Sequence, residues 1–153
     1  MTILTRLEVE EQAAYDRGIG VEYVAPGDER LEGRPARTVW TLRRISILIN
    51  RRLLNREKLE LLLHERGHIE THNARHKRSD AASELKAWAW AYEYYLPEKR
   101  LTEAAERFYL NDELDVNALA EHFDITPRFI LGALEFYRYA AIYRAPEPAL
   151  RVL

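Results

Sequence analysis

The sequence predicts an α+β protein: a small three-stranded sheet packed on helices, followed by an all-helical C-terminal part. Three observations predict this class. Runs rich in β-branched and apolar residues fall between residues 19 and 50, a helical pattern precedes them, and helical spacing dominates after residue 54. Helices segregated from a small sheet are typical of α+β folds. The 153 residues fit one domain, which we place at residues 1–144, with a loose tail over residues 145–153.

The first part of the chain supplies one helix and the three strands. Residues 2–17 carry apolar side chains at helical spacing, and Gly18 marks the end of this helix. The strands are expected where short apolar, β-branched runs are bounded by Pro, Gly or Arg residues. They lie around residues 21–24, at 38–42 (TVWTL) and at 45–50 (ISILIN), with Arg43–Arg44 at the bend between the last two.

A central helix follows the sheet. Asn55 is expected to cap it, and the helical pattern runs over residues 54–72, with an apolar side that includes Leu59 and Leu62. Asn73 marks its exit and opens a polar connector, NARHKRSD. The connector ends at Ser79 and Asp80, either of which can cap the next helix.

The helical C-terminal half begins with AASELKAWAWAYEYY, which Pro97 ends. Trp88, Tyr92 and Tyr95 share one face of this helix, so we expect them to pack in the core. Residues from about 99 to 144 predict two or three short helices, one of them starting at Thr126–Pro127, a strong helix-start signal.

Composition limits the classes of function. A net charge of −2 gives no overall attraction to nucleic acid or to an anionic membrane. The chain has no cysteine, so any metal must be held by nitrogen and oxygen ligands. The N-terminus lacks the apolar run of a signal peptide, and no stretch reaches the roughly 18 apolar residues of a membrane-spanning helix. We therefore expect a cytoplasmic protein.

Four of the five histidines recur every four residues, and the first two belong to the motif H-E-x-x-H. His64 and His68 lie one helical turn apart, so both imidazoles can point at one zinc ion, while Glu65 can reach a water bound to it. Zinc lowers the pKa of such a water and polarises a scissile carbonyl, and the glutamate transfers the proton. The same residues could instead form a solvated helix face.

Zinc in a catalytic site needs a third protein ligand. His72 is poorly placed, because each four-residue step drifts about 40° around a helix axis and moves one turn along it. Position 74, where some zinc sites have a histidine, is Ala74. We therefore expect Glu84, on the next helix, to be the ligand. His72 keeps a smaller role as a hydrogen-bond donor to an oxyanion; His76 and His122 are expected at the surface.

The segment VNALAEHFDITPRFILGALEFYR resembles a helix-turn-helix. A DNA reader of this kind presents basic and base-reading residues on its second helix. Here Phe129, Ile130 and Leu131 dominate the start of that helix, and acidic residues accompany the arginines. The pattern favours packing or substrate docking over nucleic-acid binding.

Taken with their spacing, two segments resemble the ImmA/IrrE family of metallo-endopeptidases over roughly residues 19–97. They are ISILINRRLLNREKLELLLHERGH, with Gly67 before the second histidine, and SELKAWAWAYEYYLP. The sequence departs from the family pattern at Arg66, where an aliphatic residue is usual, and at Trp88 and Trp90, where a small polar residue and phenylalanine are usual.

The resemblance implies a zincin-like core with His64, His68 and Glu84 as zinc ligands and Glu65 as catalytic base. It also implies site-specific cleavage, in the cytoplasm, of a transcriptional repressor with a helix-turn-helix domain, often encoded on a phage or another mobile element. Two alternatives stay open. One is a non-proteolytic regulatory module that binds a repressor or DNA through the C-terminal helix pair, and the other is a zinc hydrolase acting on a non-peptide bond. The sequence leaves the oligomeric state undecided.

Overall fold

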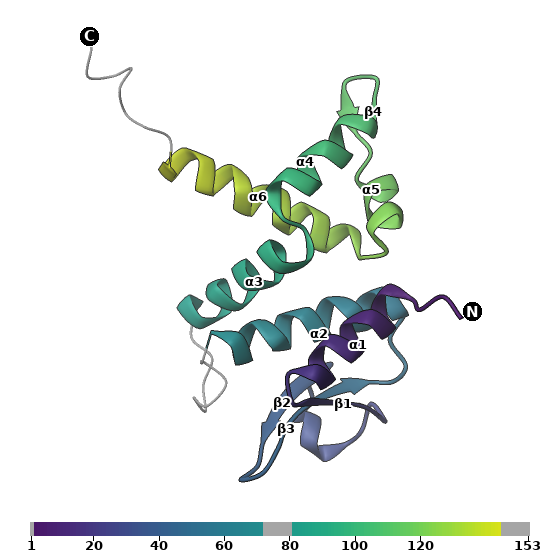
Figure 1. Cartoon of the computed structure of the whole chain (residues 1–153), viewed down its shortest axis with the longest axis vertical. Helices are drawn as coiled ribbons and strands as arrows, with labels where there is room; N and C mark the ends of the chain where they lie inside the picture. Colours follow the sequence, from purple (N-terminus) through teal and green to yellow (C-terminus); the bar gives the residue numbers. More distant parts are fainter. Residues whose placement is uncertain (1, 72–80, 145–153) are drawn as a thin grey trace.

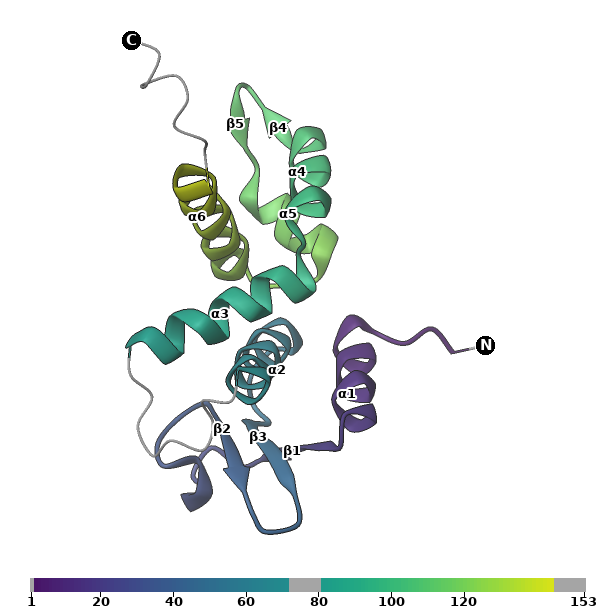
Figure 2. The same ribbon diagram turned by 60° about the vertical axis from the view of Figure 1, so that its left-hand side comes forward.

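The structure, a computed structural model, describes residues 2–71 and 81–144. Figures 1 and 2 show the sheet at one end of the molecule with helices α1 and α2 against it, α3 crossing over α2, and the C-terminal elements beyond α3. The protein is therefore α+β with a helical C-terminal part, as predicted. No helix within the described ranges is long and apolar enough to cross a membrane.

Helix α1 (Arg6–Asp16) begins later than the predicted residue 2 because Thr5 caps it. The Thr5 hydroxyl accepts from the backbone N–H of Glu8 at 3.2 Å, and the Glu8 carboxylate accepts from the N–H of Thr5 at 2.7 Å. This reciprocal pair satisfies two donors that a helix start leaves open. Gly18 follows the helix with φ of +76°, which confirms it as the stop.

The sheet contains β1 (Ile19–Val24), β2 (Ala36–Trp40) and β3 (Ile45–Asn50) in the order β1-β3-β2. Strand β3 pairs parallel to β1 and antiparallel to β2. Its bounds are those predicted, whereas β2 begins and ends two residues earlier than expected. Thr41 and Arg44 close the turn between β2 and β3, because the Thr41 N–H and hydroxyl both donate to the Arg44 carbonyl, at 2.9 and 3.1 Å. The predicted bend at Arg43–Arg44 is confirmed.

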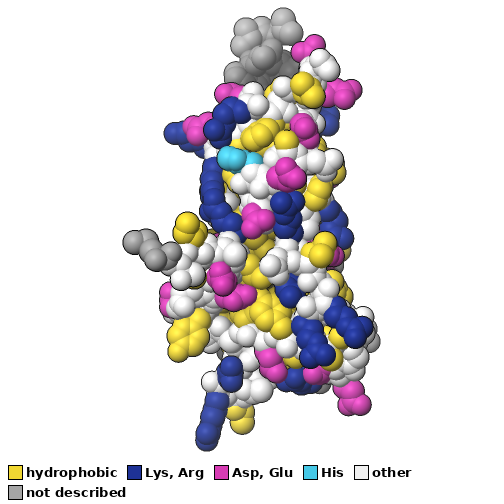
Figure 3. Space-filling model, turned by 90° about the vertical axis from the view of Figure 1, so that its right-hand side faces the viewer, with side chains coloured by type: hydrophobic (Ala, Val, Ile, Leu, Met, Phe, Trp, Pro, Cys, Tyr) yellow, Lys and Arg dark blue, Asp and Glu magenta, His cyan; other side chains and the backbone are white. Residues whose placement is uncertain are grey.

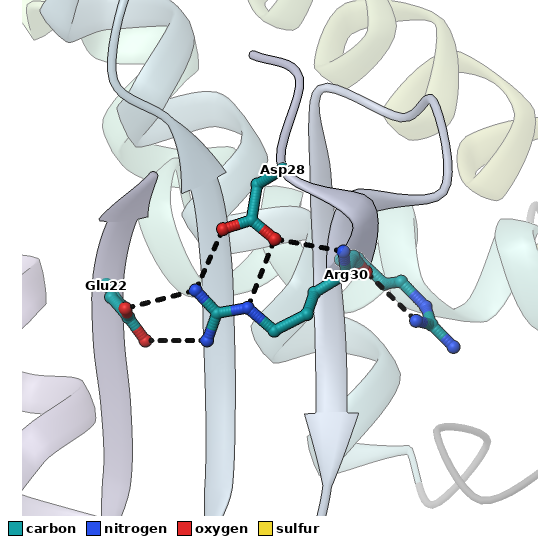
Figure 4. Close-up of polar contacts among 4 residues, drawn as sticks. Glu22, Asp28 and Arg30 are labelled. Atoms are coloured by element: carbon teal, nitrogen blue, oxygen red, sulfur yellow. Dashed lines mark hydrogen bonds and ion pairs between the residues drawn. The ribbon is translucent and has the colours of Figure 1, made fainter. Parts of the chain in front are cut away.

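A short 3-10 helix, η1 (Glu29–Leu31), covers the face of the sheet opposite α2. Leu31 packs there against Val24 and Leu48, whereas Ile47 and Ile49 belong to the main core. Figure 4 shows how the segment is held: the Arg30 guanidinium donates to Asp28 at 2.9 and 3.1 Å and to Glu22 of β1 at 3.3 and 3.4 Å. The middle strand, β3, is thus buried on both faces.

Helix α2 (Asn55–Glu70) lies on the other face of the sheet and runs beside α1. The prediction that Asn55 caps it is wrong. Asn55 is already helical and Leu54 occupies the capping position, where the Glu57 carboxylate accepts from the Leu54 N–H at 3.2 Å. A side chain three residues further along thus satisfies the N–H of Leu54, while the leucine side chain accepts no hydrogen bond from the first turn of the helix.

The C-terminal part contains α3 (Ala81–Tyr95), α4 (Glu98–Arg107), a hairpin of β4 (Tyr109–Leu110) and β5 (Glu113–Leu114), α5 (Val116–Phe123) and α6 (Pro127–Arg144). The hairpin was not predicted. Its turn residues Asn111 and Asp112 have φ of 53° and 64°, the values that a tight hairpin turn requires. Thr126 caps α6 as predicted, since its hydroxyl accepts from the N–H of Phe129 at 3.1 Å.

One hydrophobic cluster extends from the sheet through α2 and α3 into the C-terminal helices. Tyr95 of α3 is buried in it, and its hydroxyl donates to the Phe123 carbonyl at 2.5 Å. Phe129 and Ile130, at the start of α6, are fully buried. The expected core role of Tyr95 is confirmed, and α3 is the element that the sheet side and the C-terminal side share. Predicted features at Asn73, Ser79, Asp80 and residues 145–153 lie outside the described residues.

Candidate metal centre

Helix α2 presents two imidazoles on one face. His64 and His68 lie one turn apart, and their Nε2 atoms are 3.2 Å from each other. The leucines that precede them bury this part of the helix, so His64 is 9% and His68 8% exposed. Two histidine nitrogens at this separation match the edge of a tetrahedron around zinc, about 3.3 Å for Zn–N bonds near 2.0 Å.

Helix α3 brings a carboxylate to the same point. Glu84 Oε2 lies 3.1 Å from His64 Nε2, and Glu84 Oε1 lies 2.9 Å from His68 Nε2. Among the described residues, His64, His68 and Glu84 form a group whose potential ligand atoms lie within 4.8 Å of one another. Two imidazoles and one carboxylate are the donor set of many catalytic zinc sites, so these residues fit the ion that the sequence predicts.

A close crossing of α2 and α3 brings the two helices into this register. A Cβ on Gly67 would lie 2.2 Å from the Ala87 carbonyl oxygen and 2.9 Å from the Ala87 Cα. Only a glycine therefore permits this approach, and it stands directly before His68. Ala87 is three residues after Glu84, so the contact between Gly67 and Ala87 sets the positions of both His68 and Glu84.

Glu65 lies beside the pair, and strand β2 holds it. The Thr38 hydroxyl donates to Glu65 Oε2 at 2.5 Å, which leaves Oε1 as the other oxygen of the carboxylate. Burial raises the pKa of Glu65, against the opposing effects of the Thr38 hydrogen bond and the nearby His68. A carboxyl group with a raised pKa is a stronger base than an exposed glutamate.

The surroundings of His64 favour its neutral form. Burial lowers its pKa to about 4, and the charge of Glu84 opposes this shift only in part. A neutral imidazole is the form that binds a metal. The ring also stacks on the Trp88 indole, with centroids 4.1 Å apart and planes 24° from parallel.

Arg66, one of the departures from the family pattern, points away from the candidate metal centre. Its side chain is 4% exposed, and its guanidinium lies 3.5 Å from Glu10 of α1 and 3.6 Å from Glu70 of α2. It also packs over the rings of Trp90 and Tyr94 at 5.0 and 4.8 Å. The charge is thus used to join α1, α2 and α3 behind the histidines.

Of the other histidines, His122 is exposed on α5, as expected, and its ring packs on Phe108 and Phe123. His72 and His76 lie outside the described residues. Sequence reasoning missed Thr38 and the contact of Trp88 with His64. The Trp88 contact could have been found, because Trp88 is one helical turn after Glu84 and so shares its face. Nothing in the sequence of β2 signals the role of Thr38.

A small sheet, an H-E-x-x-H helix packed on it and a carboxylate from the following helix together define the zincin-like class of metallopeptidases. The chain belongs to the M78 peptidase family: the family model described as the IrrE N-terminal-like domain matches residues 14–135. This confirms the predicted ImmA/IrrE membership and gives the chain a metallopeptidase-like function. No curated protein and no solved structure matches it significantly.

Proposed function

We propose that this protein is a zinc-dependent endopeptidase that hydrolyses a peptide bond in a protein substrate. The observation that carries the proposal is the convergence of His64, His68 and Glu84 within 4.8 Å, with Glu65 next to them. The three converging residues are assigned as zinc ligands and Glu65 as the catalytic base. A zinc ion bound there supplies a Lewis acid, which acidifies a water molecule and polarises the scissile carbonyl.

The chain's own residues move the proton. Thr38 occupies Glu65 Oε2, so Oε1 is the atom that accepts the proton of the attacking water. The same carboxyl group then delivers the proton to the nitrogen of the leaving amine. Burial suits Glu65 for both steps, because its raised pKa makes it a better acceptor while the protonated form still donates to an amine.

The substrate we propose is a transcriptional repressor with a helix-turn-helix domain, encoded on a phage or another mobile element and cleaved in the cytoplasm. The support is the family resemblance. We also propose that His72 donates a hydrogen bond near the candidate metal centre.

Nucleic acid is not the proposed partner, because the start of α6, where base-reading residues would lie, packs on α3 through the buried Phe129. In Figure 3, acidic and basic side chains lie interspersed over the upper part of the face shown, which holds C-terminal elements.

The test combines metal content with cleavage. The purified chain should contain about one zinc ion, and the content should fall strongly in His68→Ala and Glu84→Ala but not in His122→Ala, an exposed histidine that serves as the matched control. Zinc should be retained in Glu65→Gln, while cleavage of candidate repressors is lost. Undiminished zinc in Glu84→Ala would refute the ligand assignment.

The alternative, a binding module without peptidase activity, gives a different result. Wild type and Glu65→Gln would then bind a repressor or DNA equally well, and neither would cut it. Equal cleavage by both proteins would instead remove the proposed role of Glu65.

A further inference from the structure

Among the described residues, Trp88 is the aromatic side chain in closest ring contact with His64. The centroids of the indole and the imidazole are 4.1 Å apart and their planes are 24° from parallel, a stacked arrangement. Trp88 lies one turn after Glu84 on the same face of α3, so one helix supplies both a carboxylate for the metal centre and a ring that covers one of its histidines. Figure 2 shows α3 lying between α2 and α6.

No protein group in the described part of the chain fixes the His64 ring through its second nitrogen. A histidine that binds a metal through one nitrogen normally donates from the other to a carboxylate, carbonyl or water, which sets the ring orientation. Within the described part of the chain, His64 Nδ1 is buried and has no hydrogen-bond partner. The flat contact with Trp88 restricts the same rotation by a different interaction.

Trp88 itself is held in place by the C-terminal side of the molecule. Its ring stacks near Tyr92, with centroids 5.9 Å apart, and meets the edge of Phe129 of α6 at 6.4 Å. Phe129 is fully buried. Besides His64, the indole therefore contacts Tyr92 and Phe129, and a rotation of its ring would disturb the packing of α3 against α6.

From these contacts we propose that Trp88 is a positioning residue for the metal centre: by stacking on the His64 imidazole it holds Nε2 toward His68 and Glu84. This inference rests on the proposed function, in which these three residues bind zinc. It predicts that zinc affinity depends on an aromatic face at position 88 rather than on apolar bulk alone.

The experiment compares two substitutions at position 88 with one at Trp90. Trp88→Leu keeps an apolar side chain and removes the aromatic face, whereas Trp88→Phe keeps a face. Zinc affinity, measured by competition with a chelator, should fall about tenfold in Trp88→Leu and stay within roughly threefold of wild type in Trp88→Phe. Trp90→Leu is the matched control, because Trp90 stacks on Tyr94 at 4.7 Å and faces Arg66 instead of the metal centre.

Cobalt provides a second measurement, one that a general loss of stability would not change. The visible absorption of Co²⁺ bound in place of zinc reports ligand geometry, and it should change in Trp88→Leu but match wild type in Trp88→Phe and Trp90→Leu. If Trp88→Leu does not fold, Trp88→Tyr and Trp88→Met make the same comparison between aromatic and aliphatic residues.

The outcomes separate the two proposals. Wild-type affinity and spectrum in Trp88→Leu, or an equal loss in Trp90→Leu, would overturn the role of Trp88 while leaving the zinc assignment intact. A wild-type chain that binds no zinc would overturn the proposed function and this inference with it. An affinity loss confined to the variants without an aromatic face at position 88 supports the inference.

Discussion

Replacing Gly67 with alanine tests the contact that brings the two helices of the metal centre together. The new Cβ would lie 2.2 Å from the Ala87 carbonyl oxygen, whereas ordinary contacts begin at 3.4 Å, so the backbones must separate by about 1.2 Å. Both partners are backbone atoms of helices, and neither can swing aside. Glu84, less than one turn from Ala87, moves with α3, while a zinc site tolerates errors of only about 0.2 Å.

Two opposing effects set the size of the change in stability. Alanine is favoured over glycine inside a helix by about 1 kcal/mol, whereas overpacking against an unyielding neighbour costs about 3 kcal/mol. The net loss is about 2 kcal/mol, which lowers the Tm of a chain of this size by roughly 4–8 °C. Zinc affinity should fall by at least about tenfold, since the Glu84 carboxylate is displaced.

The assay is thermal unfolding of the metal-free protein together with zinc titration. Gly27→Ala is the matched control, because a Cβ on Gly27 would meet nothing within 4 Å. It should leave zinc affinity unchanged and Tm unchanged or slightly raised. A Gly67→Ala protein with wild-type Tm and wild-type zinc affinity would show that the crossing of α2 and α3 does not set the geometry of the centre.

Three further predictions follow from other contacts. Thr38→Val should lower kcat by about tenfold with little change in KM, because the hydroxyl that orients Glu65 is lost. Arg128→Ala should destabilise the protein by about 2 kcal/mol in urea unfolding, because it leaves the Glu60 carboxylate, 1% exposed, without its two hydrogen bonds at 2.8 and 3.0 Å. Burial raises the pKa of Tyr95 to about 12, so the unfolded chain loses that proton first and the free energy of unfolding should fall between pH 10 and 12.

Each of these predictions has its own control. Thr38→Ser keeps the hydroxyl and should retain most of the activity, and equal loss in both Thr38 variants would remove the orienting role. Adding Glu60→Gln to Arg128→Ala should recover part of the lost stability, because the uncompensated charge is removed. If no stability is recovered, the unpaired Glu60 carboxylate is not the cause of the loss. Tyr95→Phe should flatten the decline above pH 10, and an unchanged slope would contradict the assignment to Tyr95.

Local signals made part of this fold predictable from sequence. The middle of strand β3, Ile47 to Ile49, is an unbroken apolar run because both faces of the strand are buried there, and the bounds predicted for the strand were correct. Gly18 and Thr126 act through their own backbone neighbourhood, so their roles as helix stop and helix cap were also predicted. His64, His68 and Glu84 were expected together because helical periodicity and one reversal of the chain suffice to place them near one another.

The misses have physical causes. Asn55 was assigned as the cap from residue preference, but it is already helical, and the Glu57 carboxylate accepts from the N–H of Leu54 at the capping position. The β4–β5 hairpin has strands of two residues, too short for any alternation to appear. The Thr38 contact with Glu65 depends on how β2 lies against α2, which is a tertiary property that no local pattern encodes.

Because the ligand candidates are split between α2 and α3, a metal ion held by them would also link the two helices. An ion shared by His68 of α2 and Glu84 of α3 would bind the folded form alone, because only folding brings these residues together. At a free zinc concentration about 100 times Kd, this binding adds about 2.7 kcal/mol to the free energy of unfolding. The stability of the folded chain would then depend on the zinc concentration around it, and a chelator would lower the Tm.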